Sequence, residues 1–94
     1  FVIASFANSN TEKVWLRERV SKWSPELQRV AHRKLLMIDA ADFLADLRIP
    51  PGNRLEPLSG DRAGQHSIRV NDQWRICFSW TSAGAENIEI VDYH

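Results

Sequence analysis

Two alternating apolar runs on either side of a short polar stretch restrict the fold more than any other feature of the chain. Every second residue is apolar in both runs, so each is predicted to be a strand with one buried face. The apolar residues are Ile68 and Val70 in the first run and Trp74, Ile76, Phe78 and Trp80 in the second. A two-residue turn would place the two apolar sets on opposite faces, whereas a three-residue connection at 71–73 places them on the same face. The chain is therefore predicted to form an antiparallel hairpin in which Ile68 pairs with Ile76.

The same register has a chemical consequence on the other face of the hairpin. It makes Arg69 and Arg75 cross-strand neighbours, beside Ser67 and Cys77. Like charges in this arrangement repel each other, and packing gives no reason for them. The pair indicates either an anion-binding surface or a solvated strand face, on which exposed arginines are common.

The first part of the chain is predicted to form a strand and a helix. Residues 2–6 are a short β-prone run, and Ser9 followed by Glu12 has the spacing of a capping box. We therefore expect a strand at 2–6 and a first helix over residues 11–19.

A second and longer helix is predicted to follow. Ser24 and Pro25 have the pattern of an N-cap followed by a proline in the first helical turn. Apolar residues then recur at helical spacing to about residue 45. Pro50 and Pro51 cannot continue the helix, because proline lacks an amide hydrogen and disfavours the helical conformation of the residue before it.

The remainder of the chain is predicted to be strands. Residues 55–58 form a weak strand that Pro57 restricts to a sheet edge, and residues 87–91 form the last strand. The predicted fold class is α+β, with one strand, two helices and then an antiparallel sheet. We expect the helices to pack on one face of this sheet and the other face to be open.

Composition limits the classes of function. The 94 residues are enough for one domain, 1–94, and the 12 basic and 12 acidic residues cancel, so the protein as a whole is no polycation. The single cysteine, Cys77, excludes an internal disulfide, and no cysteine and histidine spacing resembles a metal site. There is no long apolar stretch and no signal-peptide pattern. We expect a protein of the reducing cytoplasm, without a metal, a cofactor or a membrane partner.

Three protic side chains follow the last predicted strand. Asp92, Tyr93 and His94 bring a carboxylate, a phenol and an imidazole to the point where a core strand ends. Such a position holds side chains in place while leaving them open to solvent. The triplet is either a functional site or a frayed polar terminus.

Several short motifs together resemble the RelE/ParE superfamily of bacterial toxins, and most of all its HigB branch. The resemblance covers nearly the whole chain in the order of its elements. Its most specific motifs are the segments 51–55, 60–61, 68–70, 73–75 and 92–94. It implies a toxin of a type II toxin–antitoxin system, a ribosome-dependent endoribonuclease that cuts translated mRNA. It also implies that a HigA-like helix-turn-helix antitoxin holds the toxin inactive and that duplex DNA is bound only through this antitoxin.

The resemblance also implies roles for individual residues. Asp92, Tyr93 and His94 are expected in the active site together with Arg75, and Arg69 and Arg54 are expected to contact RNA phosphate. Two positions depart from the pattern of several members. Glu56 replaces a histidine, and Ser59 replaces a lysine. Glu56 is then either a general base or a partner that keeps Arg54 in place, and we favour the partner.

These residue types suit RNA cleavage without a metal. The 2′-hydroxyl attacks the adjacent phosphorus, which requires a proton acceptor, a cation for the phosphate oxygens and an acid for the departing 5′-oxygen. His94 and Asp92 can exchange protons, and Arg75 can brace the phosphate in a bidentate manner. Tyr93 can stack on a base or donate a proton.

Two other functions stay open at this point. One is a ParE-like toxin that inhibits gyrase, which needs neither the terminal triplet nor the arginine pair. The other is a catalytically inactive module that only binds the antitoxin, for which Glu56, Ser59 and the zero net charge are the support.

Overall fold

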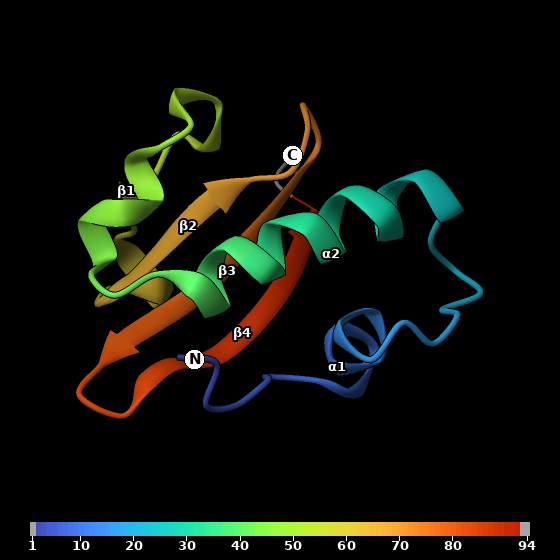
Figure 1. The fold of residues 1–94 in the computed structure, drawn as a ribbon, viewed down its shortest axis with the longest axis horizontal. Helices are drawn as coiled ribbons and strands as arrows, with labels where there is room; N and C mark the ends of the chain where they lie inside the picture. Colours follow the sequence, from blue (N-terminus) through green and yellow to red (C-terminus); the bar gives the residue numbers. More distant parts are fainter. Residues whose placement is uncertain (1, 93–94) are drawn as a thin grey trace.

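The computed structural model describes residues 2–92, which form a four-stranded antiparallel sheet with two α-helices. The helices are α1 (Ser9–Trp15) and α2 (Pro25–Ala40), and three short 3-10 helices follow: η1 (Leu44–Arg48), η2 (Pro51–Asn53) and η3 (Gly60–Arg62). The strands are β1 (Glu56–Pro57), β2 (Gln65–Arg69), β3 (Trp74–Thr81) and β4 (Gly84–Asp92), in the spatial order β1-β2-β3-β4. Figure 1 shows α2 lying across the sheet, with α1 beside it. This is the predicted α+β class.

The predicted hairpin register is confirmed. Ile68 pairs with Ile76 and Arg69 pairs with Arg75, and the amide of Val70 donates to the carbonyl of Trp74 at 2.9 Å. The side chain of Asn71 closes the connection, because its oxygen accepts from the amides of Gln73 and Trp74 at 2.9 Å each. An asparagine that bonds to backbone amides two and three residues further on stabilises such a turn.

The core lies between this sheet and the helices. One side of α2 is buried at positions that recur every three or four residues, as an amphipathic helix requires. These α2 residues are Leu27, Ala31, Leu35 and Ile38, and they belong to one cluster with Ile68, Ile76, Phe78, Ile88 and Ile90 from the strands. The alternation of the strands therefore leaves Arg69, Arg75 and Cys77 on the helix-free face.

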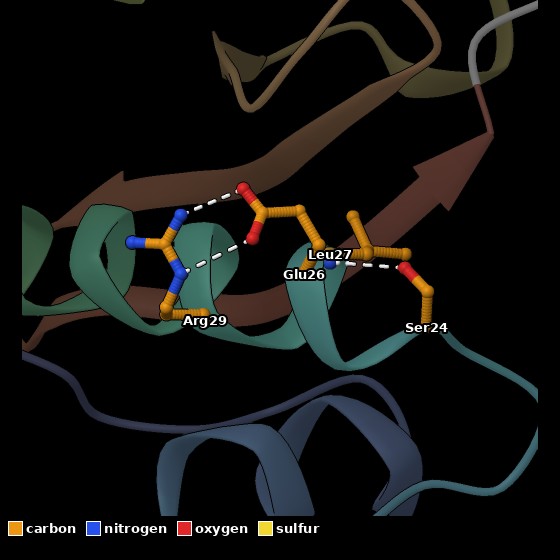
Figure 2. A network of polar contacts seen from close by, with 4 residues as sticks. All are labelled: Ser24, Glu26, Leu27 and Arg29. Atoms are coloured by element: carbon orange, nitrogen blue, oxygen red, sulfur yellow. Dashed lines mark hydrogen bonds and ion pairs between the residues drawn. The ribbon is translucent and has the colours of Figure 1, made fainter.

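The start of α2 follows the predicted capping pattern. The hydroxyl of Ser24 accepts from the amide of Leu27 at 3.1 Å (Figure 2). Pro25 occupies the first turn. An exposed ion pair joins Glu26, in the same first turn, to Arg29 at 2.6 Å. The cap supplies a partner for an amide that the helix itself cannot satisfy.

Both helices are shorter than predicted. Helix α1 covers Ser9–Trp15 instead of residues 11–19, and its N-cap is Asn8, whose side chain accepts from the amide of Thr11. It ends because Arg17 takes the left-handed conformation with φ 63°. Helix α2 ends at Ala40 rather than near residue 45. The carboxylate of Asp46 accepts from the amides of residues 42 and 43, which competes with continued helix.

The predicted first strand is extended but makes only isolated bridges with β4. Ile3 bridges Ala85 and Phe6 bridges Ile88, both in parallel orientation. The amides of Val2 and Ile3 instead donate to the carboxylate of Asp39 at 3.2 Å each. This segment passes so close to β4 that a Cβ at Gly84 would lie 2.1 Å from the carbonyl oxygen of Val2, so glycine is required there.

Two further features of residues 2–92 are the edge strand and the length of the helices. The weak strand at 55–58 is confirmed as the edge strand β1, reduced to Glu56–Pro57. No helix in this part of the chain combines the length and the apolar character that crossing a bilayer requires.

Candidate functional site

Arg75 is the centre of a polar cluster on the helix-free face. Its Nε donates to the hydroxyl of Ser67 at 2.7 Å, and its Nη2 donates to the carbonyl oxygen of Arg54 at 2.7 Å. A carboxylate oxygen of Glu56 lies 3.6 Å from the same Nη2. Arg75 is only 8% exposed, so these contacts orient a guanidinium that is largely removed from solvent. A guanidinium that is held at two of its nitrogens presents its remaining donors in a defined plane.

The strand register explains why Ser67 meets Arg75. Ser67 lies two residues before Arg69 on β2, so period-2 alternation places both on the same face. Arg69 pairs directly with Arg75, and Ser67 is the diagonal neighbour of Arg75 across the two strands. The short edge strand brings Arg54 and Glu56 next to them, because Glu56 pairs with Ser67. Local alternation and one edge pairing therefore build the cluster.

Each arginine of the cross-strand pair has its own carboxylate. Arg69 forms an ion pair with Asp72, while Glu56 lies beside Arg75. Two acidic partners offset the repulsion between the adjacent cations. Glu56 was expected to hold Arg54, and the structure corrects this, since the ion pair that Glu56 forms is with Arg75. Arg54 contributes its carbonyl oxygen to the cluster, and its side chain is exposed.

A second ion pair crosses the same face. Arg62 of η3 contacts Glu89 of β4 at 2.9 Å and donates to the side chain of Gln65 at 3.0 Å. In the sheet, Cys77 lies between Ser67 and Glu89 and is fully buried. The helix-free face was expected to be open, but at Ser67, Arg75 and Cys77 it is covered. Side chains from η3 and β1 reach over the strands there.

This burial determines the reactivity of Cys77. Loss of solvent raises the pKa of its thiol, and the charges of Glu89 and Glu56 add to the effect, while Arg62 and Arg75 oppose it. A raised pKa lowers the fraction of reactive thiolate at any given pH. We expect iodoacetamide at pH 8 to label Cys77 far more slowly in the native protein than in urea. Mass spectrometry over time would measure this, and equal rates in both states would contradict the burial.

Asp92 lies at the end of β4, on a different side of the sheet from Arg75. It pairs with Trp74, whereas Arg75 pairs with Val91, so alternation points the two side chains to opposite faces. Gln73 donates to the carboxylate of Asp92 at 2.9 Å. The other two residues of the predicted triplet, Tyr93 and His94, lie outside the described residues. The structure thus brings together Arg75, Arg69, Arg54 and Glu56, and it separates Asp92 from them by register.

Two features of this region were not predicted from the sequence. The pair Arg62–Glu89 joins positions 27 residues apart, and no motif spacing predicts it. Asn53 is fully buried and belongs to the motif at 51–55, but neither the resemblance nor the spacing assigned it a role. Ser67, in contrast, could be found from the strand period alone.

A pocket lies beside the Arg75 cluster, and a larger groove lies between the helices. A pocket of about 320 Å³ beside the cluster is lined by Glu56, Pro57, Leu58, Ser59, Asp61 and Arg62. A groove of about 500 Å³ lies on the helix side, between the end of α1 and α2, and Arg29 of Figure 2 lies on its wall. Among residues 2–92, no three histidine, cysteine or acidic side chains form a group that could hold a metal ion.

Solved structures of known toxins have the same fold. The chain resembles the structure "YoeB-YefM complex from Staphylococcus aureus" with a TM-score of 0.64 at 14% identity, over 98% of this chain and 97% of that chain. It also resembles "YoeB/ParE toxin from Agrobacterium tumefaciens" with a TM-score of 0.55 at 17% identity, over the full length of both chains. At these identities the likeness concerns the fold alone.

Other known proteins share a higher sequence identity with the chain. The chain is 49% identical over 61 residues to "Toxin HigB-1" of Vibrio cholerae, which is 65% of this chain and 64% of that protein. It is 44% identical over 61 residues to "Endoribonuclease HigB" of Proteus vulgaris, covering 65% of each. These matches thus span slightly less than two thirds of either relative. The family model for the RelE-like toxin HigB of type II toxin–antitoxin systems matches residues 4–94. With this match over nearly all of its length, the chain belongs to the HigB-like toxin family.

Proposed function

We propose that this protein is a toxin that cuts translated mRNA on the ribosome as a metal-independent endoribonuclease and thereby arrests growth. The observation that carries the proposal is the fixed guanidinium of Arg75, which Ser67 and the carbonyl of Arg54 hold beside Arg69. A relative of this chain is named an endoribonuclease, and the family is one of toxins. The whole chain, 1–94, acts as one toxin domain in this proposal.

In the reaction, Arg75 binds the scissile phosphate. The carboxylate of Glu56 is 3.6 Å from Nη2 and its side chain is about half exposed, so a phosphate oxygen can replace it at this edge. Arg69, which pairs with Arg75 across the strands, and Arg54, whose carbonyl accepts from it, supply further positive charge to the RNA backbone. Their charge stabilises the oxyanions that develop as the 2′-hydroxyl attacks phosphorus.

The residues at the end of the chain supply the proton transfers in this proposal. His94 and Asp92 accept the proton of the 2′-hydroxyl and return one to the departing 5′-oxygen, and Tyr93 stacks on a base or donates a proton. Because Asp92 and Arg75 point to opposite faces of the sheet, Asp92 would have to leave Gln73 and the end of β4 would have to rearrange before Asp92 could reach a phosphate at Arg75. Glu56 then serves as the resting partner of Arg75 rather than as the general base.

The partners follow from charge and from the family. An equal number of acidic and basic residues gives the toxin little affinity for nucleic acid in general, so the ribosome must position the mRNA. A HigA-like helix-turn-helix antitoxin would hold the toxin inactive, and duplex DNA would be bound through that antitoxin. The place of action is the cytoplasm, where translation occurs.

Mapping of mRNA 5′ ends after induced expression tests the proposal. We expect new ends within translated regions that carry a 5′-hydroxyl, with a 2′,3′-cyclic phosphate on the upstream fragment, because the 2′-hydroxyl is the nucleophile. The role of a metal is tested with a chelator on naked message, because the ribosome itself needs Mg²⁺ and chelation would stop translation. In vitro, the same message should be cut rapidly on ribosomes and slowly when naked.

Other outcomes would assign another function. Double-strand DNA breaks without new mRNA ends would indicate a gyrase-inhibiting toxin. Binding of the antitoxin without growth arrest would indicate an inactive module. Ends that carry a 5′-phosphate would contradict the proposed mechanism.

A further inference from the structure

A buried asparagine joins three segments of the chain next to the Arg75 cluster. Asn53 is fully buried at the end of η2. Its Oδ1 accepts from Nζ of Lys34 on α2 at 2.7 Å. Its Nδ2 donates to the carbonyl oxygens of Leu47 at 3.2 Å and Ile49 at 3.4 Å. One side chain therefore fixes η2 both to α2 and to the end of η1.

The backbone that leaves Asn53 leads directly to Arg75. Arg54 takes the left-handed conformation, with φ 46° and ψ 55°, and its amide donates to the carbonyl of Pro51 at 3.1 Å. This conformation is uncommon for residues other than glycine and persists where the surrounding structure holds it. It determines the direction of the Arg54 carbonyl, and that oxygen accepts from Nη2 of Arg75 at 2.7 Å.

We infer that Asn53, held by Lys34, is a positioning residue that sets the plane of the Arg75 guanidinium through the carbonyl of Arg54. The inference rests on the proposed ribonuclease function for its activity readout. Ser67 accepts from Nε of the guanidinium and Arg54 accepts from Nη2. A shift of the η2 turn would move the partner of Nη2 and rotate the donors that face the phosphate. A misplacement of about 1 Å can cost on the order of 100-fold in rate.

The choice of an amide at position 53 is consistent with this role. Lys34 is partly buried, and its pKa is lowered by this burial and by the neighbouring charges of Arg33 and Arg69. A carboxylate at position 53 would neutralise Lys34 and could not donate to the carbonyls of Leu47 and Ile49. An asparagine accepts from the lysine, donates to the carbonyls and leaves the local positive charge intact.

The direct test observes the guanidinium itself by NMR. The Nε–H of Arg75 in the folded wild-type protein should give a protected signal with slow exchange, because it is buried and bonded to Ser67. We expect Asn53→Ala to shift this signal and to accelerate its exchange. Gln28→Ala is the matched control, since the side-chain amide of Gln28 on α2 donates to the carbonyls of Val20 and Trp23 in the preceding loop and has no bond to the Arg75 cluster. The control should lower stability and leave the Arg75 signal unchanged.

A second variant keeps the test decisive if Asn53→Ala does not fold. Lys34→Met removes the bond to Oδ1 together with the positive charge, and it retains the apolar part of the lysine. It should move the Arg75 signal in the same direction by a smaller amount. An unchanged Arg75 signal in a folded Asn53→Ala or Lys34→Met protein would overturn the inference.

Kinetics separate positioning from general stability. Asn53→Ala should lower kcat on ribosome-bound message by about 10- to 100-fold with KM nearly unchanged, because the lost interaction acts in the transition state. In an Arg75→Ala background the same change should cost little more, since Asn53 acts through Arg75. Equal losses in both backgrounds would overturn the inference. If the wild type does not cleave RNA at all, the ribonuclease proposal fails, and the NMR comparison still decides the positioning role.

Discussion

Arg75→Ala is expected to abolish growth arrest and to lower the rate of cleavage on the ribosome by about 10²- to 10³-fold. Loss of one preorganised donor to a developing oxyanion typically costs this much. The variant also removes the partner of the Ser67 hydroxyl and of the Arg54 carbonyl. A buried polar group without a partner costs about 1–3 kcal/mol, so the variant should also unfold at a lower temperature.

The comparison with Arg75→Lys separates charge from geometry. Lysine keeps the positive charge, but its compact ammonium cannot reach Ser67 and Arg54 in one plane. We expect its rate to lie between those of wild type and Arg75→Ala. Cleavage on purified ribosomes, with unfolding midpoints of each variant, would measure both effects. Arg19→Ala is the matched control, because Arg19 is exposed and lines the groove on the helix side. A folded Arg75→Ala protein with wild-type toxicity would remove Arg75 from the mechanism.

The register of the central hairpin could be predicted because it depends on local rules. Alternation assigns each side chain to a face, and the length of the turn aligns the two strands, so Ile68 meets Ile76 without any tertiary information. The same reasoning predicts that Arg69 and Arg75 are neighbours on the helix-free face. Both statements follow from residues 68–76 alone.

The helix boundaries could not be predicted in the same way. The end of α1 depends on the left-handed conformation of Arg17, and the sequence has no glycine at this position that would predict it. The end of α2 depends on the carboxylate of Asp46, which accepts hydrogen bonds from two backbone amides. These amides belong to a segment in which the apolar helical pattern of the sequence still continues. Single hydrogen bonds from side chains decide whether the backbone continues the helix, and the apolar periodicity of the sequence does not predict them.

The environment of the site was only partly predictable. The cluster was expected on an open face, but Arg62 and Glu89 meet across it from distant parts of the chain. Glu56 was expected to be the partner of Arg54, whereas the sheet places Glu56 3.6 Å from Arg75. Contacts between distant segments thus bury Arg75, while Arg69 stays partly exposed and pairs with the nearby Asp72.

The terminal triplet leads to the second prediction with a large effect. His94→Ala and Tyr93→Ala are each expected to abolish growth arrest while the fold is kept, because the core residues of β4, Ile88 and Ile90, precede them. Loss of a general acid or base costs about 10²- to 10⁴-fold in rate. His94→Gln should fail to restore activity, since glutamine forms hydrogen bonds but cannot take up a proton.

Asp92 provides the internal comparison for this prediction. Its register places it away from Arg75, and Gln73 holds its carboxylate. If Asp92 transfers protons, it must leave Gln73, so Gln73→Ala should keep or raise the rate while Asp92→Asn lowers it. If Asp92 only orders the end of β4, Gln73→Ala and Asp92→Asn should cause similar small losses. Single-turnover cleavage on ribosomes, with thermal unfolding of each variant, separates the two cases. Folded His94→Ala and Tyr93→Ala proteins that still arrest growth would assign the proton transfers to residues outside the triplet.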